Sequence, residues 1–116
     1  MIRVVDVRGL RTPAERATVV YVGRFFAGWP ASRYGNPFKP RPGFDAVKAY
    51  RSWFLGRPRE MVEDALAELW EATGHGEKPL GCWCGSWQAG VSPAEPEFCH
   101  AIVLAKLLHE RFGGTQ

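Results

Sequence analysis

A segment rich in glycine and proline limits how this chain can fold. Residues 25–43 carry residues that break helices and strands at short intervals, namely Gly28, Pro30, Gly35, Pro37, Pro40, Pro42 and Gly43. This spacing excludes a long helix or strand within the segment. The same stretch contains aromatic side chains that can pack on a core, namely Phe25, Phe26, Trp29, Tyr34 and Phe38. We therefore expect an ordered loop, with strands before it and helices after it.

Length and composition indicate one folded domain. The chain has 116 residues, which fits a single compact domain of roughly 100–150 residues. Hydrophobic residues make up 46% and charged residues 23% of the chain, a balance that excludes a disordered or low-complexity protein. We expect one domain over residues 1–116, with residues 113–116 as a frayed tail.

Nothing in the sequence indicates a membrane span or secretion. No apolar run approaches the roughly 20 residues that a membrane helix needs. The N-terminal residues lack the apolar stretch and the cleavage site of a signal peptide. Three cysteines cannot all pair within one chain, so they are expected to be reduced thiols or metal ligands. The sequence predicts a soluble, cytoplasmic protein with no membrane partner.

The apolar patterns predict an α/β fold. Residues 2–7 and 18–22 are rich in β-branched residues and predict two buried strands that pair with each other. Asp45 can cap a helix that ends near Gly56, and an apolar stripe predicts a second helix over residues 59–73.

The C-terminal part completes this prediction. Residues 80–84 predict a short strand, and a last helix is expected to start between Ser92 and Pro96 and to end at Gly113. This order predicts a small single-domain layered α/β fold with a mixed or parallel sheet and about three helices, Rossmann-like in part.

All three cysteines lie in this C-terminal part, together with a histidine. The alternation of a strand would place Cys82 and Cys84 on the same side, and Cys99-His100 follow after a loop. Three thiolates and an imidazole suit a tetrahedral zinc ion, and three cysteines alone can hold an iron–sulfur cluster with one iron left open. Against a single ion, neighbouring residues of a helix point about 100° apart, which separates Cys99 from His100.

The same residues allow two interpretations without a metal. Cys99 near a helix N-terminus would have a lowered pKa and could act as a nucleophile, with His100 as the acid or base. Alternatively, the cysteines fill the core, as free cysteines often do. The residues leave all three alternatives open.

A second group of candidates binds a ligand through the loop. Arg24 follows a predicted strand, and ligands of α/β folds bind beyond the carboxyl ends of strands, so Arg24 is placed for a phosphate or carboxylate. The turn Gly35-Asn36 offers an amide, Phe38 can stack on a planar ligand, and Lys39 adds charge. The alternative is that this loop only covers the core.

The net charge agrees with an anionic partner. The formal charge is +3 and the isoelectric point is about 9.0, which favours anionic partners in general. A nucleotide-like small molecule fits this charge, and nucleic acid is a possible partner.

Several motifs in order resemble the bacterial and phage family called domain of unknown function 4326. These are Val-Tyr-Val-Gly-Arg, Gly-Asn-Pro-Phe, a helix with Tyr50 and Trp53, Leu-Gly-Cys-Trp-Cys, and Cys-His before a helix. The resemblance runs from about Val19 to Leu108 and adds Trp83 to the candidate residues. It brings no settled activity. This chain differs in the extra residues before Gly35 and in a longer link between Cys84 and Cys99.

Two functions compete on this evidence. The first is a hydrolase or transferase that binds a nucleotide-like or other anionic molecule between the Arg24 loop and the cysteines, with or without a metal. The second is a non-catalytic module that binds nucleic acid or protein and contains a structural zinc site of Cys82, Cys84, Cys99 and His100.

Overall fold

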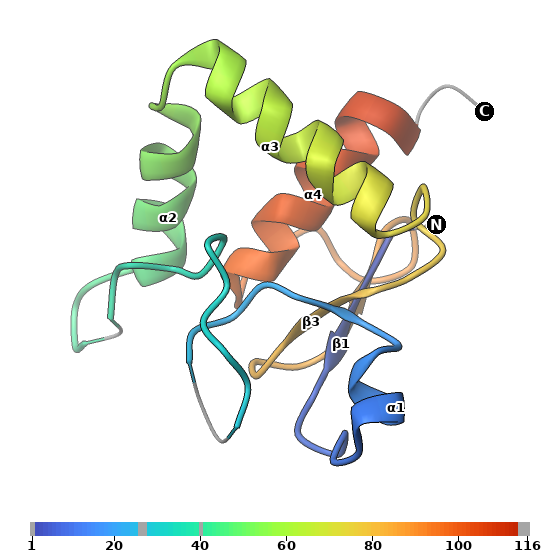
Figure 1. Cartoon of the computed structure of the whole chain (residues 1–116). Coiled ribbons are helices and arrows are strands. Elements are labelled where there is room, and N and C mark those ends of the chain that lie inside the picture. Colours follow the sequence, from blue (N-terminus) through green and yellow to red (C-terminus); the bar gives the residue numbers. More distant parts are fainter. Residues whose placement is uncertain (1, 26–27, 40, 114–116) are drawn as a thin grey trace.

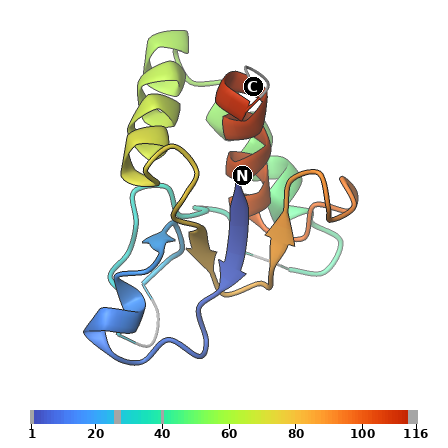
Figure 2. The same cartoon turned by 90° about the vertical axis from the view of Figure 1, so that its right-hand side faces the viewer.

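Four short strands form one mixed sheet in the order β2-β3-β1-β4. The computed structural model describes residues 2–25, 28–39 and 41–113; Phe26 and Pro40 of the expected loop and residues 114–116 of the expected tail lie outside these ranges. The strands are β1 (Arg3–Asp6), β2 (Val20–Tyr21), β3 (Leu80–Cys82) and β4 (Trp87–Gln88). β1 and β2 lie parallel to β3, and β4 lies antiparallel to β1 (Figure 2).

The prediction that the first two strands pair with each other is wrong. β3 lies between β1 and β2 and pairs with both. All residues of β3 are buried, whereas both residues of β2 are only half-buried. A strand that is buried on both faces belongs inside a parallel sheet, and a half-buried strand suits its edge.

Two of the helices lie where the sequence predicts them. α2 (Ala46–Leu55) is capped by Asp45, whose carboxylate accepts hydrogen bonds from the amides of Val47 and Lys48. α3 (Arg59–Ala72) follows after a short link. A further helix, α1 (Pro13–Arg16), was not expected, although Thr12 and Glu15 form a capping box at its start. None of the described helices is long and apolar enough to cross a membrane.

The last helix, α4 (His100–Phe112), starts later than the sequence predicts. Tertiary contacts hold the preceding residues away from a helical path. Lys106 donates a hydrogen bond to the carbonyl of Ala94, and Glu97 pairs with Arg51 and Lys106. Cys99 is therefore the N-cap of α4, with an extended backbone (φ −152°, ψ 144°). Gly113, the first residue of the expected tail, caps the other end of the helix.

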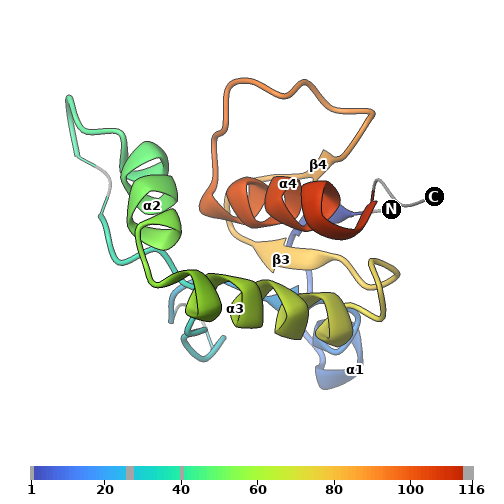
Figure 3. The same cartoon turned by 90° about the horizontal axis from the view of Figure 1, so that it is seen from above.

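The helices α2, α3 and α4 lie on the same side of the sheet, and α4 lies directly on its strands (Figures 1 and 3). α4 packs on β1 and β3 and also contacts α2 and α3, so it lies at the centre of the main core. The other face carries a smaller cluster around Val7, Val19 and Trp29. Residues of β1 alternate between the two clusters, as a strand with two covered faces requires.

Candidate functional site

A pocket of about 490 Å³ opens at the edge of the sheet where the three parallel strands end. Arg8 follows β1, Gly23 and Arg24 follow β2, and Cys82 to Cys84 end β3, and all of these residues line the pocket. The carboxyl ends of parallel strands are where α/β folds place their ligands. A second hollow of about 550 Å³ lies against Val5 and Val19 and has no thiol or imidazole in its lining.

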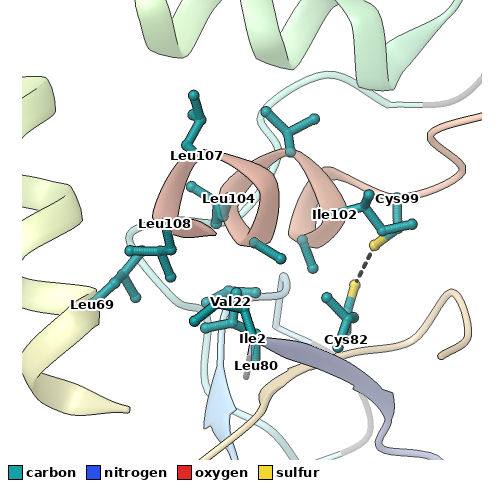
Figure 4. Close-up of a cluster of buried hydrophobic side chains, with 14 of the residues drawn as sticks. Ile2, Val22, Leu69, Leu80, Cys82, Cys99, Ile102, Leu104, Leu107 and Leu108 are labelled. Carbon is teal, nitrogen blue, oxygen red and sulfur yellow. Dashed lines mark hydrogen bonds between the residues drawn. The ribbon is translucent and has the colours of Figure 1, made fainter. Parts of the chain in front are cut away.

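Two cysteines and one histidine meet in the wall of this pocket. Cys82 lies on the helix-covered face of β3, and its sulfur is 2.9 Å from that of Cys99 (Figure 4). The sulfur of Cys99 is 3.9 Å from Nδ1 of His100. The ligand atoms of these three buried residues all lie within 4.8 Å of one another. The structure therefore brings together three of the four residues that the sequence grouped, while Cys84 is exposed beside them.

The expected conflict between Cys99 and His100 does not occur. It assumed that both residues belong to a helix, in which neighbouring side chains point about 100° apart. Because Cys99 is extended and only His100 begins α4, the two side chains can turn toward the same point.

The ring of His100 is held in one orientation. Its Nε2 lies 2.6 Å from the carbonyl oxygen of Val22, which can only accept, so Nε2 carries the proton. Burial lowers the pKa of His100, although the hydrogen bond to Val22 opposes this effect, and the imidazole is neutral. Tyr50 packs edge-on against the ring at 5.0 Å. The lone pair of Nδ1 is thus left on the side of Cys99.

The third thiol differs from the other two in exposure and in charge. Cys84 is exposed, and its sulfur lies 3.8 Å from that of Cys82. Hydrogen bonding with Cys82 and Cys99 lowers the pKa of Cys84 to about 3, with help from the charge of Arg24. Hydrogen bonds with Cys82 and Cys84, together with burial, raise the pKa of Cys99 well above its usual value. The hydrogen bond with Cys84 and burial raise the pKa of Cys82 to about 11, although the hydrogen bond with Cys99 opposes this effect. The thiolate form is therefore favoured most at Cys84, the exposed member of the three.

These residues fit a single metal ion. Tetrahedral zinc, with Zn–S bonds of about 2.3 Å, separates two sulfur ligands by roughly 3.8 Å. The distance between Cys82 and Cys84 already matches, and that between Cys82 and Cys99 would widen from 2.9 Å by roughly 0.9 Å. The Nε2–H of His100 donates a hydrogen bond to a carbonyl oxygen, as the second ring nitrogen of metal-binding histidines usually does. The Cys82, Cys99 and His100 cluster can hold a metal.

Comparison with known proteins agrees with the motifs that line this site. The family described as domain of unknown function (DUF4326) matches residues 5–110, which include every residue of the pocket. The chain belongs to the DUF4326 family. No curated protein and no solved structure gives a significant match to it.

Two predicted ligand residues of this DUF4326 domain line the pocket but also hold its loop together. Nε of Arg24 donates to the carbonyl of Asn36 at 2.7 Å, and its Nη2 donates to the carbonyl of Phe38. The buried amide of Asn36 donates to the carbonyl of Ala46 and accepts from the amide of Phe38. Both residues therefore fasten the loop to the strand end and to the start of α2.

The remaining predicted ligand residues divide into two groups. Trp83 lines the pocket, and its indole NH donates to the hydroxyl of Tyr21 at 2.8 Å. Gly35, Phe38 and Lys39 lie in the loop but not in the pocket lining. Gly35 packs against the end of β2, since a Cβ there would lie 3.1 Å from the carbonyl oxygen of Gly23.

Several pocket residues were not predicted from the sequence. Arg8 lies at the end of β1 and pairs with Asp6 at 2.5 Å. The rings of Phe25 and Phe98 also line the pocket, although 72% and 45% of their surfaces are exposed. The position of Arg8 directly after a predicted strand was the available clue, whereas Phe98 follows from the late start of α4.

A charged network fixes the approach to Cys99. Glu97 pairs with Arg51 of α2 at 2.5 Å and with Lys106 of α4 at 3.0 Å, and its side chain is only 14% exposed. Both pairs connect the segment before Cys99 to two different helices. The network therefore fixes the end of the long Cys84–Cys99 link that lies next to Cys99.

Proposed function

We propose that this DUF4326 domain is a hydrolase or transferase that binds an anionic, nucleotide-like molecule over a metal ion held by Cys82, Cys99 and His100. The observation that carries the proposal is the presence of three ligand atoms, within 4.8 Å of one another, in the wall of the pocket. Three protein ligands leave one tetrahedral position for water or substrate, which is the pattern of catalytic zinc sites.

Zinc suits this donor set better than a cluster. Two sulfurs and one imidazole nitrogen are typical zinc ligands. Cysteines of an iron–sulfur cluster bind different irons, whereas the sulfurs of Cys82 and Cys99, at 2.9 Å, are close enough to share one ion. A zinc ion supplies a Lewis acid and lowers the pKa of a water bound to it.

The other pocket residues supply the groups that a nucleotide would need. The guanidinium groups of Arg8 and Arg24 line the pocket and suit a phosphate, which they can bind through the N–H groups that are not used by Asp6 and by the loop carbonyls. The rings of Trp83, Phe25 and Phe98 offer faces for a base. Asn36 shapes the pocket wall, and Lys39 extends the positive charge along the loop that Gly35 and Phe38 form.

Metal content is the first test. Anaerobic purification followed by elemental analysis is expected to give close to one metal ion per chain, and Cys82→Ser or Cys99→Ser is expected to abolish binding. Cys84→Ser is the matched control, because Cys84 lies outside the set of three ligands, and it should keep the metal. Purified protein that contains no metal and takes up neither Zn²⁺ nor Co²⁺ would overturn the proposal.

Ligand binding is the second test. Calorimetry should show binding of nucleoside monophosphates and much weaker binding of the matching nucleosides. Arg8→Ala and Arg24→Ala are each expected to weaken binding about tenfold or more, since hydrogen bonds to charged groups contribute roughly 1.5–3 kcal/mol. Arg59→Ala removes the same charge outside the pocket lining and should bind normally. Equal binding of nucleotide and nucleoside would refute the phosphate site.

One observation favours a second function. The 3.8 Å between Cys82 and Cys84 suits two ligands of one ion, so Cys84 could close a Cys3His site. A closed zinc site is structural and would fit a module that binds nucleic acid or protein. In that case Cys84→Ser would lose the metal and unfold, and the Co²⁺ form would show absorption from three thiolates instead of two.

A further inference from the structure

Two reduced thiols, Cys82 and Cys99, lie very close to each other in this domain. The sulfurs of Cys82 and Cys99 are 2.9 Å apart, and a disulfide bond is about 2.05 Å long. Figure 4 shows the two side chains pointing toward each other, one from β3 and one from the start of α4. A relative movement of roughly 0.9 Å would therefore be enough to join them.

Both of these thiols are almost fully buried in the wall of the pocket. Cys82 is 3% exposed and Cys99 is 1% exposed. Cys84 is exposed on the pocket, and its sulfur lies 3.8 Å from that of Cys82. The three sulfurs thus form a path from the pocket to the buried pair, through Cys84 and then Cys82.

We propose that Cys82 and Cys99 form a reversible disulfide by exchange with a small-molecule disulfide, and that Cys84 is the thiol through which the exchange enters. The pocket admits the small disulfide, and glutathione disulfide is a suitable probe of this class. The site is then a redox couple as well as a candidate metal centre.

The exchange proceeds in three thiolate attacks. The thiolate of Cys84 attacks one sulfur of the small disulfide, breaks its S–S bond, forms a mixed disulfide and releases the first thiolate. The thiolate of Cys82 attacks the sulfur of Cys84 and releases the second. Cys99 then attacks Cys82, breaks the Cys82–Cys84 bond and restores the thiolate of Cys84. In total, two protein thiols are oxidised and one small disulfide is reduced to two thiols, which take up the two protons.

The geometry favours the last step. Cys82 and Cys84 are separated by one residue, so a bond between them is strained, whereas Cys82 and Cys99 lie on different elements and already face each other. A disulfide sulfur no longer binds a metal as a thiolate does. This consequence rests on the proposed function: oxidation of the pair and metal binding exclude each other.

The test uses the metal-free protein with mixtures of glutathione and glutathione disulfide. Mass spectrometry after alkylation should show a product that is lighter by two hydrogen atoms, with Cys82 linked to Cys99 and Cys84 alkylated. Cys84→Ser should form the same Cys82–Cys99 bond at a rate that is at least about tenfold lower. Cys99→Ser should stop at glutathione on Cys84 or at a Cys82–Cys84 bond.

Three outcomes would overturn the inference: no Cys82–Cys99 link in protein whose circular dichroism shows it folded, a Cys82–Cys84 bond as the stable product of the unaltered chain, or an unchanged rate in Cys84→Ser.

Zn²⁺ titration of the reduced and oxidised forms separates this inference from the proposed function. A disulfide in a protein that never binds Zn²⁺ supports the redox couple and refutes the metal centre. Metal binding by a protein that forms no disulfide supports the metal centre and refutes the redox couple. Equal Zn²⁺ binding by the reduced and oxidised forms would refute the statement that oxidation and metal binding exclude each other.

Discussion

Cys99 decides which chemistry is available to its neighbours. Its extended backbone directs its thiol to Cys82, while His100 takes the first helical position and presents Nδ1. A helical Cys99 would have separated the two side chains. The carbonyl of Val22, which fixes the His100 ring, follows directly after β2. His100 therefore links the end of this strand to the cluster.

Gly81 of β3 has no room for a larger side chain. A Cβ at this position would lie 2.7 Å from Cγ1 of Val7 and 2.9 Å from Cγ2 of Val19, both of which are buried. We expect Gly81→Ala to lower the free energy of unfolding by about 1–3 kcal/mol, because the small core must move apart. Denaturant unfolding measures this change.

Gly9→Ala is the matched control for that measurement. No atom lies within 4 Å of a Cβ built at Gly9, so its free energy of unfolding should change by no more than about 0.5 kcal/mol. If both alanine variants are equally stable, Gly81 is not held by contact with the second cluster.

At the scale of elements, the link before α4 depends on side chains that lie far apart in the sequence. Glu97 joins Arg51 of α2 to Lys106 of α4. Hydrogen bonds from both cations lower the pKa of Glu97 despite the opposing effect of burial, so the carboxylate stays charged. These contacts keep residues before Cys99 outside the helix, which in turn gives the cluster its geometry.

Glu97→Gln tests this role. The amide keeps the shape but leaves Arg51 without its anionic partner and Lys106 with only Glu95 at 3.7 Å, so we expect a loss of about 1–3 kcal/mol in the free energy of unfolding. Glu63→Gln is the control, because Glu63 pairs with Arg111 at 3.2 Å while its side chain is 43% exposed. Exposed pairs contribute about 0–1 kcal/mol. Equal losses in thermal or denaturant unfolding would show that burial of the Glu97 network adds nothing.

At the scale of the whole molecule, the site lies where three parts of the fold meet. The parallel strands bring Arg8, Arg24 and Cys84 to one edge of the sheet, and α4 brings Cys99 and His100 to the same edge. The two core clusters lie on opposite faces, and each shares residues with the pocket lining: Cys82 and Cys99 belong to the main cluster and Trp83 packs on the smaller one. The pocket is therefore a feature of the sheet edge, with α4 as its connection to the core.

Hydrogen exchange should reveal this division. Amides of β1, β3 and α4 are expected to exchange most slowly, because both strands are paired on two sides and α4 contacts the sheet and two helices. Residues 94–98, which lie outside the sheet and the helices, should exchange much faster. Mass spectrometry of peptides from the native protein measures both. Protection of residues 94–98 equal to that of β3 would mean that the link belongs to the core.

The sequence by itself determined the features that rest on local chemistry. Helix caps and apolar stripes placed α2 and α3, and soft ligands at the C-terminal end predicted a cluster. The predicted strand over residues 80–84 is shorter in the structure, because β3 ends at Cys82 and Cys84 lies beyond it. The capping box of α1 was equally local and could have been found.

Only the tertiary structure decided the remaining features, because contacts between distant residues control them. Central β3 depends on how completely each strand is buried, and the start of α4 depends on Glu97 and its partners in two helices. That start sets the backbone of Cys99 and so brings its sulfur to Cys82. Such pairings follow from packing free energy over the whole domain, which no local pattern of residues records.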